Sequence, residues 1–119
     1  MAFVSRVQAS GQSGFSAIQI VGDTASSLVA TGSTANDALQ LTAAINAITT
    51  SAASTGVRLP ATEAGARVSI YNLSGQTITI YPQTGSTINN AAASVTVANT
   101  KSIELIADTA THWFSQLSA

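Results

Sequence analysis

Apolar and polar residues alternate in short runs along this chain, which is the pattern of half-buried β-strands rather than of helices. The alternation recurs in segments 15–21, 56–59, 66–72, 76–81, 87–88, 95–97, 103–105 and 113–117. Turn-forming residues separate these runs, among them Pro60, the pair Ser74-Gly75 and the stretch from Pro82 to Gly85. We interpret Ser74-Gly75 as the turn of a hairpin between its flanking strands.

Residues 34–50 fit two patterns. Thr34 followed by Asp37 resembles a helix-capping pair, and Leu41, Ile45 and Ile48 fall at helical spacing. The same stretch also contains alternating apolar residues, a turn of small residues and a β-branched end, which favours two strands. We favour the two strands and keep the helix as the alternative.

Short strands at spacings of about 8–12 residues are typical of sandwiches and barrels. We therefore expect an all-β protein, a single compact antiparallel β-sandwich or barrel-like domain over residues 15–119. Residues 1–14 hold too few apolar groups for a core of their own and predict an extended N-terminal arm. The candidate partner-binding residues of this arm are Phe3, Val4, Arg6 and Val7.

Composition narrows the classes of partner. Charged residues make up 8% of the 119 residues, against roughly 25% in ordinary domains, and the net charge is −1. Nucleic-acid binding requires clustered cations, whereas the four here are scattered at Arg6, Arg58, Arg67 and Lys101. We expect no nucleic-acid and no membrane partner, and a weakly charged surface of this kind promotes association.

The chain has no cysteine, so disulfides and thiolate metal sites are excluded. Its first residues lack the apolar run of a signal peptide, and no stretch approaches the ~20 apolar residues of a membrane span. We expect synthesis in a cytoplasm.

Candidate catalytic residues are few. His112 is the only histidine, and Asp108 precedes it by four positions, so a serine triad is conceivable, but the sequence lacks a G-x-S-x-G nucleophile motif. We interpret His112 as a strand-edge or surface residue. Asp23 and Glu63 lie in expected turns, which does not favour a catalytic carboxylate pair. We predict no enzymatic activity, no cofactor and no metal site.

The aromatic residues suggest contacts instead. Trp113 and Phe114 are adjacent, so a strand would direct one into the core and leave the other for an interface. Tyr71 and Tyr81 flank the expected hairpin and are predicted to pack across its strands. Stacking on sugars is the alternative role for these tyrosines.

Three blocks resemble structural proteins of tailed-bacteriophage virions: TGVRLP from Thr55, VSIYN from Val68 and IYPQTGSTIN from Ile80. A closing tryptophan, Trp113, completes the similarity, which covers about residues 38–117. The resemblance extends to small capsid decoration (cement) proteins and to related head-fibre and tail-fibre β-modules. It implies a β-rich, non-enzymatic homotrimer on the capsid surface of a virion, made in the host cytoplasm.

The length of the chain favours a decoration protein over a long fibre with shaft repeats. We therefore expect a structural protein that bridges capsomers, with the major capsid protein as its partner. The alternative is a fibre or tail-associated receptor-binding module, for which carbohydrate would be the ligand. A carbohydrate-binding or enzymatic domain of another origin is the third possibility.

Overall fold

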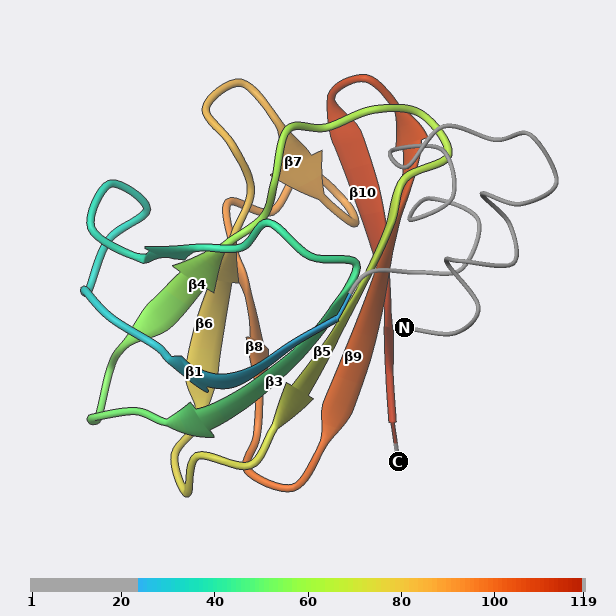
Figure 1. Cartoon of the computed structure of the whole chain (residues 1–119). Coiled ribbons are helices and arrows are strands. Elements are labelled where there is room, and N and C mark those ends of the chain that lie inside the picture. The colour runs from blue at the N-terminus through green and yellow to red at the C-terminus, as the bar shows by residue number, and fades with distance from the viewer. Residues whose placement is uncertain (1–23, 119) are drawn as a thin grey trace, which may run out of the picture.

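The computed structural model describes residues 24–118, which form strands and turns and no helix (Figure 1). The all-β prediction is confirmed. The strands are β1 (Thr24–Val29), β2 (Leu39–Gln40), β3 (Ile45–Thr50), β4 (Gly56–Arg58), β5 (Arg67–Asn72), β6 (Ile78–Tyr81), β7 (Thr87–Ile88), β8 (Val95–Val97), β9 (Ser102–Thr109) and β10 (His112–Leu117). Within the described range, therefore, no helix is long and apolar enough to cross a membrane.

The strands belong to two sheets, and the chain alternates between them. The six-stranded sheet has the order β1-β3-β5-β9-β10-β7, and the four-stranded sheet has the order β2-β4-β6-β8. From β1 to β6, every strand of one sheet is followed by a strand of the other. The chain therefore winds as a β-solenoid, with β1, β3 and β5 stacked in parallel on one side and β2, β4 and β6 on the other.

The prediction of an antiparallel sandwich or barrel is wrong in its strand pairing, because five of the eight strand pairs in the described residues are parallel. The predicted hairpin at Ser74-Gly75 is wrong as well. A turn is present there, with Gly75 at φ +87°, but it carries the chain from β5 in one sheet to β6 in the other. Turn-forming residues bend the chain and leave open whether the next strand pairs with the last one or crosses over.

A buried amide holds this crossover. The Asn72 side chain is fully buried, and its Nδ2 donates to the carbonyl oxygens of Gln76, at 2.6 Å, and Val97, at 3.0 Å. Its Oδ1 accepts from the backbone N–H of Ser74 at 3.0 Å and from the Ser74 hydroxyl at 2.6 Å. Asn72 begins an Asn-Leu-Ser sequon, and its burial gives this asparagine a structural role in the corner.

The core lies between the two sheets, as the alternation predicted, and contains side chains from both. Ile48, Ile70 and Leu105 come from the six-stranded sheet, and Val57 and Ile80 from the four-stranded sheet, all fully buried. The third coil, which consists of β5 and β6, is closed by two antiparallel pairs, β5 with β9 and β6 with β8. The β9–β10 hairpin then carries Trp113, also fully buried, into the same core.

Residues 34–50 form the two strands β2 and β3, as favoured, and the Thr34–Asp37 pair stabilises a turn rather than a helix. Strand β1 was not predicted, because its sequence TASSLV holds only two large apolar residues. The predicted strand at 15–21 and the arm at 1–14 lie outside the described residues.

Candidate functional site

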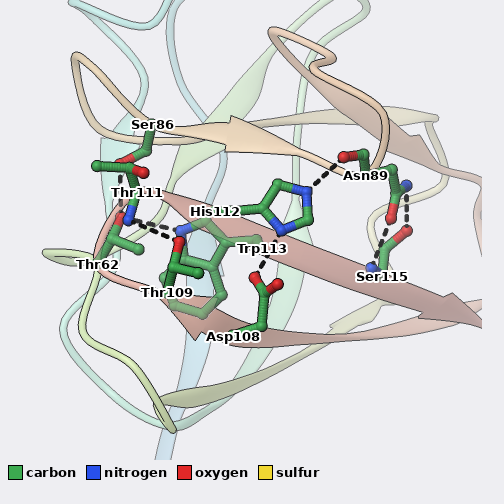
Figure 2. A network of polar contacts seen from close by, with 9 residues as sticks. All are labelled: Thr62, Ser86, Asn89, Asp108, Thr109, Thr111, His112, Trp113 and Ser115. Atoms are coloured by element: carbon green, nitrogen blue, oxygen red, sulfur yellow. Dashed lines mark hydrogen bonds and ion pairs between the residues drawn. The ribbon is translucent and has the colours of Figure 1, made fainter.

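His112 is held between two acceptors at the start of β10 (Figure 2). Its Nδ1 lies 2.5 Å from Oδ1 of Asp108, which comes from β9 across the hairpin. Its Nε2 contacts the backbone carbonyl oxygen of Asn89, directly after β7. These two acceptors fix the ring, and the Phe114 ring packs edge-on against it at 5.3 Å between centroids.

This arrangement favours the imidazolium form of His112. The carbonyl of Asn89 raises the pKa of His112 above its ordinary value, and the Asp108 carboxylate raises it further. In a Ser-His-Asp triad, Nε2 accepts the serine proton, but here Nε2 faces a carbonyl that requires a donor. The structure therefore brings His112 and Asp108 together as an ion pair and does not arrange them as the base of a triad.

The Asn89 side chain extends the same network. Its Nδ2 donates to the Ser115 hydroxyl at 2.7 Å, and its Oδ1 accepts the Ser115 backbone N–H at 2.9 Å. Asn89 has a φ of +53°, a region that asparagine tolerates better than most residues. With its carbonyl on His112 and its side chain on Ser115, Asn89 anchors the segment after β7 along β10.

A second set of polar contacts lies beside the first in Figure 2. The Trp113 Nε1–H donates to the Thr62 hydroxyl at 3.1 Å, and Thr62 shares a hydrogen bond of 2.8 Å with Ser86. Thr62 and Ser86 line a shallow groove of about 700 Å³, formed by segments 40–42, 60–62, 83–86 and 110–111. The buried indole is thus satisfied from the groove side.

The described residues that line the groove contribute hydroxyls, amides and apolar groups, and none of them is charged. Gln40 and Gln83 cross it: Gln83 Nε2 donates to Gln40 Oε1 at 2.9 Å and to the Leu59 carbonyl at 2.7 Å. Gln40 Nε2 donates to the carbonyls of Leu41 and Leu59. Both glutamine side chains are bonded within the protein, so a neutral polar molecule that binds at either of them would exchange an internal hydrogen bond.

Two further acidic side chains, Asp37 and Glu104, form contacts away from His112. Asp37 accepts from the backbone N–H of Thr34 at 2.8 Å and from the Thr34 hydroxyl, and these bonds lower its pKa. Glu104 pairs with Arg67 at 3.0 Å. Among residues 24–118, no group of three or more histidine or acidic side chains could hold a metal ion.

The exposed apolar side chains gather on the six-stranded sheet and its borders. In the described range, six large apolar residues are 47–58% exposed: Val29, Ile45, Tyr71, Leu73, Phe114 and Leu117. The adjacent aromatics separate as predicted, since Trp113 is fully buried and Phe114 is 47% exposed. The tyrosines do not pack across a hairpin, because Tyr71 and Tyr81 lie in different sheets.

Sequence reasoning missed most of this surface. Ile45 and Tyr71 belong to alternating runs that predict one buried face, but the runs do not say which residues remain uncovered. The parallel register decides this, because Ile45 pairs with Ser69 and Ala47 with Tyr71, all on the side opposite the core. The arm residues Phe3, Val4, Arg6 and Val7 lie outside the described residues, as does Asp23.

Comparison of the chain with family models, with curated proteins and with solved structures finds no match.

Proposed function

We propose that this protein is a non-enzymatic structural subunit of a tailed-phage virion that decorates and stabilises the capsid. The observation that carries the proposal is the contrast between its two kinds of surface. The polar network around His112 is closed on itself, while large apolar side chains such as Tyr71 and Phe114 remain uncovered on one sheet. Exposed apolar patches mark surfaces that bind other proteins.

The segment from Thr55 to Asn89 resembles phage virion proteins, and this resemblance is why we propose a virion as the assembly. A capsid thins as DNA fills it, and a decoration subunit opposes the outward pressure by joining neighbouring capsomers. Buried apolar area drives such attachment, and strand addition adds main-chain hydrogen bonds. In this proposal the major capsid protein is the partner, the decoration subunit is a homotrimer, and carbohydrate has no role.

The N-terminal residues supply the second contact in this proposal. Phe3, Val4 and Val7 are apolar, and Arg6 can meet a carboxylate or a carbonyl. Burial of such side chains contributes roughly 1.5–3 kcal/mol each before ordering costs. We propose that these four residues dock on a neighbouring subunit or on the capsid.

The direct test is the position of the labelled protein on intact particles of the phage that encodes it. Electron cryomicroscopy with a labelled antibody fragment should place the protein across the shell. Label confined to the tail or to a few fibres would contradict the decoration role, and particles without label would contradict the virion proposal altogether.

The groove favours one alternative, a receptor-binding module of a fibre. Its lining of hydroxyls and amides, which includes Gln40 and Gln83, matches the hydrogen-bonding needs of a neutral glycan. Glycan-array binding that is abolished by Gln83→Ala would support this alternative. Gln116→Ala is the control, because this glutamine lies on β10 outside the groove lining. Its substitution should leave glycan binding unchanged.

A further inference from the structure

Arg58 is the only charged residue in the strands of the four-stranded sheet, β2, β4, β6 and β8. Val57, which precedes it, is fully buried in the core, so Arg58 lies on the outer face of β4. Both ion pairs of the described residues belong to the six-stranded sheet. Within that part of the chain, therefore, Arg58 is a partly buried cation without a carboxylate partner.

The guanidinium of Arg58 has unused hydrogen-bonding capacity. In residues 24–118 its side chain donates one hydrogen bond, from Nη2 to the Thr84 hydroxyl at 3.3 Å, and its Nε is buried without a partner. A long bond to a neutral oxygen is weak for a guanidinium, whose bonds to carboxylates are shorter and about twice as strong. The Thr84 hydroxyl accepts this bond and keeps its own proton to donate. Arg58 and Thr84 thus offer two neighbouring donors to an oxyanion.

These two donors stand at the border of the groove. Thr84 lines the groove, and Arg58 pairs in register with Gln40, which also lines it. Gln83, the neighbour of Thr84 in the chain, is bonded to Gln40. A molecule whose acidic group binds at Arg58 therefore has beside it a groove of about 700 Å³, a volume typical of small-molecule sites.

We propose that this groove binds an acidic sugar, with the sugar carboxylate at Arg58 and Thr84 and its hydroxyls along the uncharged lining. The amides of Gln40 and Gln83 offer donors and acceptors to sugar hydroxyls in exchange for their internal hydrogen bond. One cation matches the single negative charge of a uronic or sialic acid, whereas a nucleic acid would require clustered cations.

This site is separate from the surface that carries the proposed attachment to the capsid. Arg58 belongs to the four-stranded sheet, whereas the exposed Tyr71 and Phe114 belong to the six-stranded sheet. Sugar binding is thus a further activity, which does not depend on the decoration role. Under the receptor-binding alternative, it narrows the ligand of the groove from a neutral to an acidic glycan.

Matched sugars test the role of the carboxylate, since glucuronic acid carries a carboxylate where glucose carries a hydroxymethyl group. An array of glucuronate-terminated and sialate-terminated oligosaccharides, each beside a neutral counterpart, should show binding of the purified protein to acidic members. Calorimetric titration at low salt should give an affinity about tenfold higher for the acidic sugar than for its neutral counterpart. This preference should fall as the salt concentration rises.

Three variants locate the acidic sugar on the protein. Arg58→Gln should abolish the preference for the acidic member of each pair. Thr84→Val removes the second donor at an exposed position and should reduce the preference. Arg67→Gln is the matched control, because it removes the same charge from the six-stranded sheet and should leave the preference unchanged. Circular dichroism checks that the strands of every variant persist.

Three results would overturn the inference: equal binding of acidic and neutral sugars, an acid preference that survives Arg58→Gln, or no binding to any glycan. Binding to polyglutamate without binding to acidic sugars would assign Arg58 to a protein partner and overturn it as well. These measurements use purified protein and glycans, so their failure is distinct from failure of the virion proposal, which depends on where the protein lies on particles.

Discussion

At the scale of single residues, buried polar side chains explain where the chain turns. The Asn72 side chain is fully buried, and both its Nδ2 donor and its Oδ1 acceptor are hydrogen-bonded. The Asn46 side chain is 1% exposed, and its Nδ2 donates to the carbonyls of Ala43 and Ser69. Each joins backbone segments that are distant in the sequence. A sequence pattern places such residues in strands or turns, but their partners appear only when the coils are stacked.

The Asn72 side chain provides the first prediction. Asn72→Ala leaves the carbonyls of Gln76 and Val97 without their donor, so we expect a loss of about 1–3 kcal/mol in the free energy of unfolding. Urea denaturation measures this loss. Asn99→Ala is the control, since Asn99 accepts one exposed hydrogen bond from Gly75 N–H, and a cost equal to that of Asn72→Ala would contradict the account.

His112 gives a prediction about pH. Its pKa is raised in the folded chain by Asn89 and Asp108, so its contribution to stability is complete below the unfolded value near 6.5. The contribution is lost as pH rises through the higher folded pKa. His112 is the only histidine, so its NMR titration is unambiguous. Asp108→Asn should lower the measured pKa, and a wild-type pKa at or below 6.5 would show that the ring lacks these acceptors in solution.

At the scale of elements, the sequence predicted most strands but not their partners. Alternating residues located β5, β6, β8, β9 and β10, because one face of each is buried. Pairing depends on the path of the chain between strands. Thr24 pairs with Ile45 and Ile45 with Ser69, so each coil takes a little over twenty residues, and this spacing is not accompanied by a repeated sequence.

In the candidate site, too, the sequence predicted contacts only between residues that lie close together along the chain. Asp108 and His112 could be related from the sequence because one hairpin separates them, whereas Asn89 meets His112 only through the parallel pairing of β7 with β10. The groove was not predicted, since it is formed by four segments that lie far apart in the sequence. Long-range parallel pairing leaves little local signal.

The stacking of β4 on β6 yields a prediction at this scale. A Cβ on Gly56 would lie 2.5 Å from the Thr79 carbonyl oxygen and 2.8 Å from the Tyr81 ring. We expect Gly56→Ala to cost about 1–3 kcal/mol through overpacking, measured by thermal unfolding. Gly75→Ala is the control, because an added Cβ there meets nothing within 4 Å and the cost is confined to strain at positive φ. Equal costs would show that close approach is not what requires Gly56.

At the scale of the whole molecule, the low content of charged residues and the exposed apolar side chains support the proposal that this protein is a subunit of a larger assembly. With 8% charged residues, the surface has little repulsion to keep copies apart. In the described residues, the core lies between the two sheets. Association therefore concerns the outer face and, in our proposal, the N-terminal residues.

Deletion of residues 1–10 tests the second of these contacts. The described core is formed by side chains between Ala30 and Trp113, so we expect the strands to persist with near-wild-type circular dichroism. We expect weaker binding to particles or a less stable trimer. A truncated protein with unchanged particle affinity and unchanged oligomeric state would show that Phe3, Val4, Arg6 and Val7 make no such contact.

The most direct test of the central claim is a count of this chain in purified virions. Calibrated mass spectrometry of the particles should give a small whole-number ratio to the major capsid protein, because a subunit that bridges capsomers must repeat over the shell. A handful of copies per particle would favour the fibre alternative. Complete absence from purified particles would contradict the virion role.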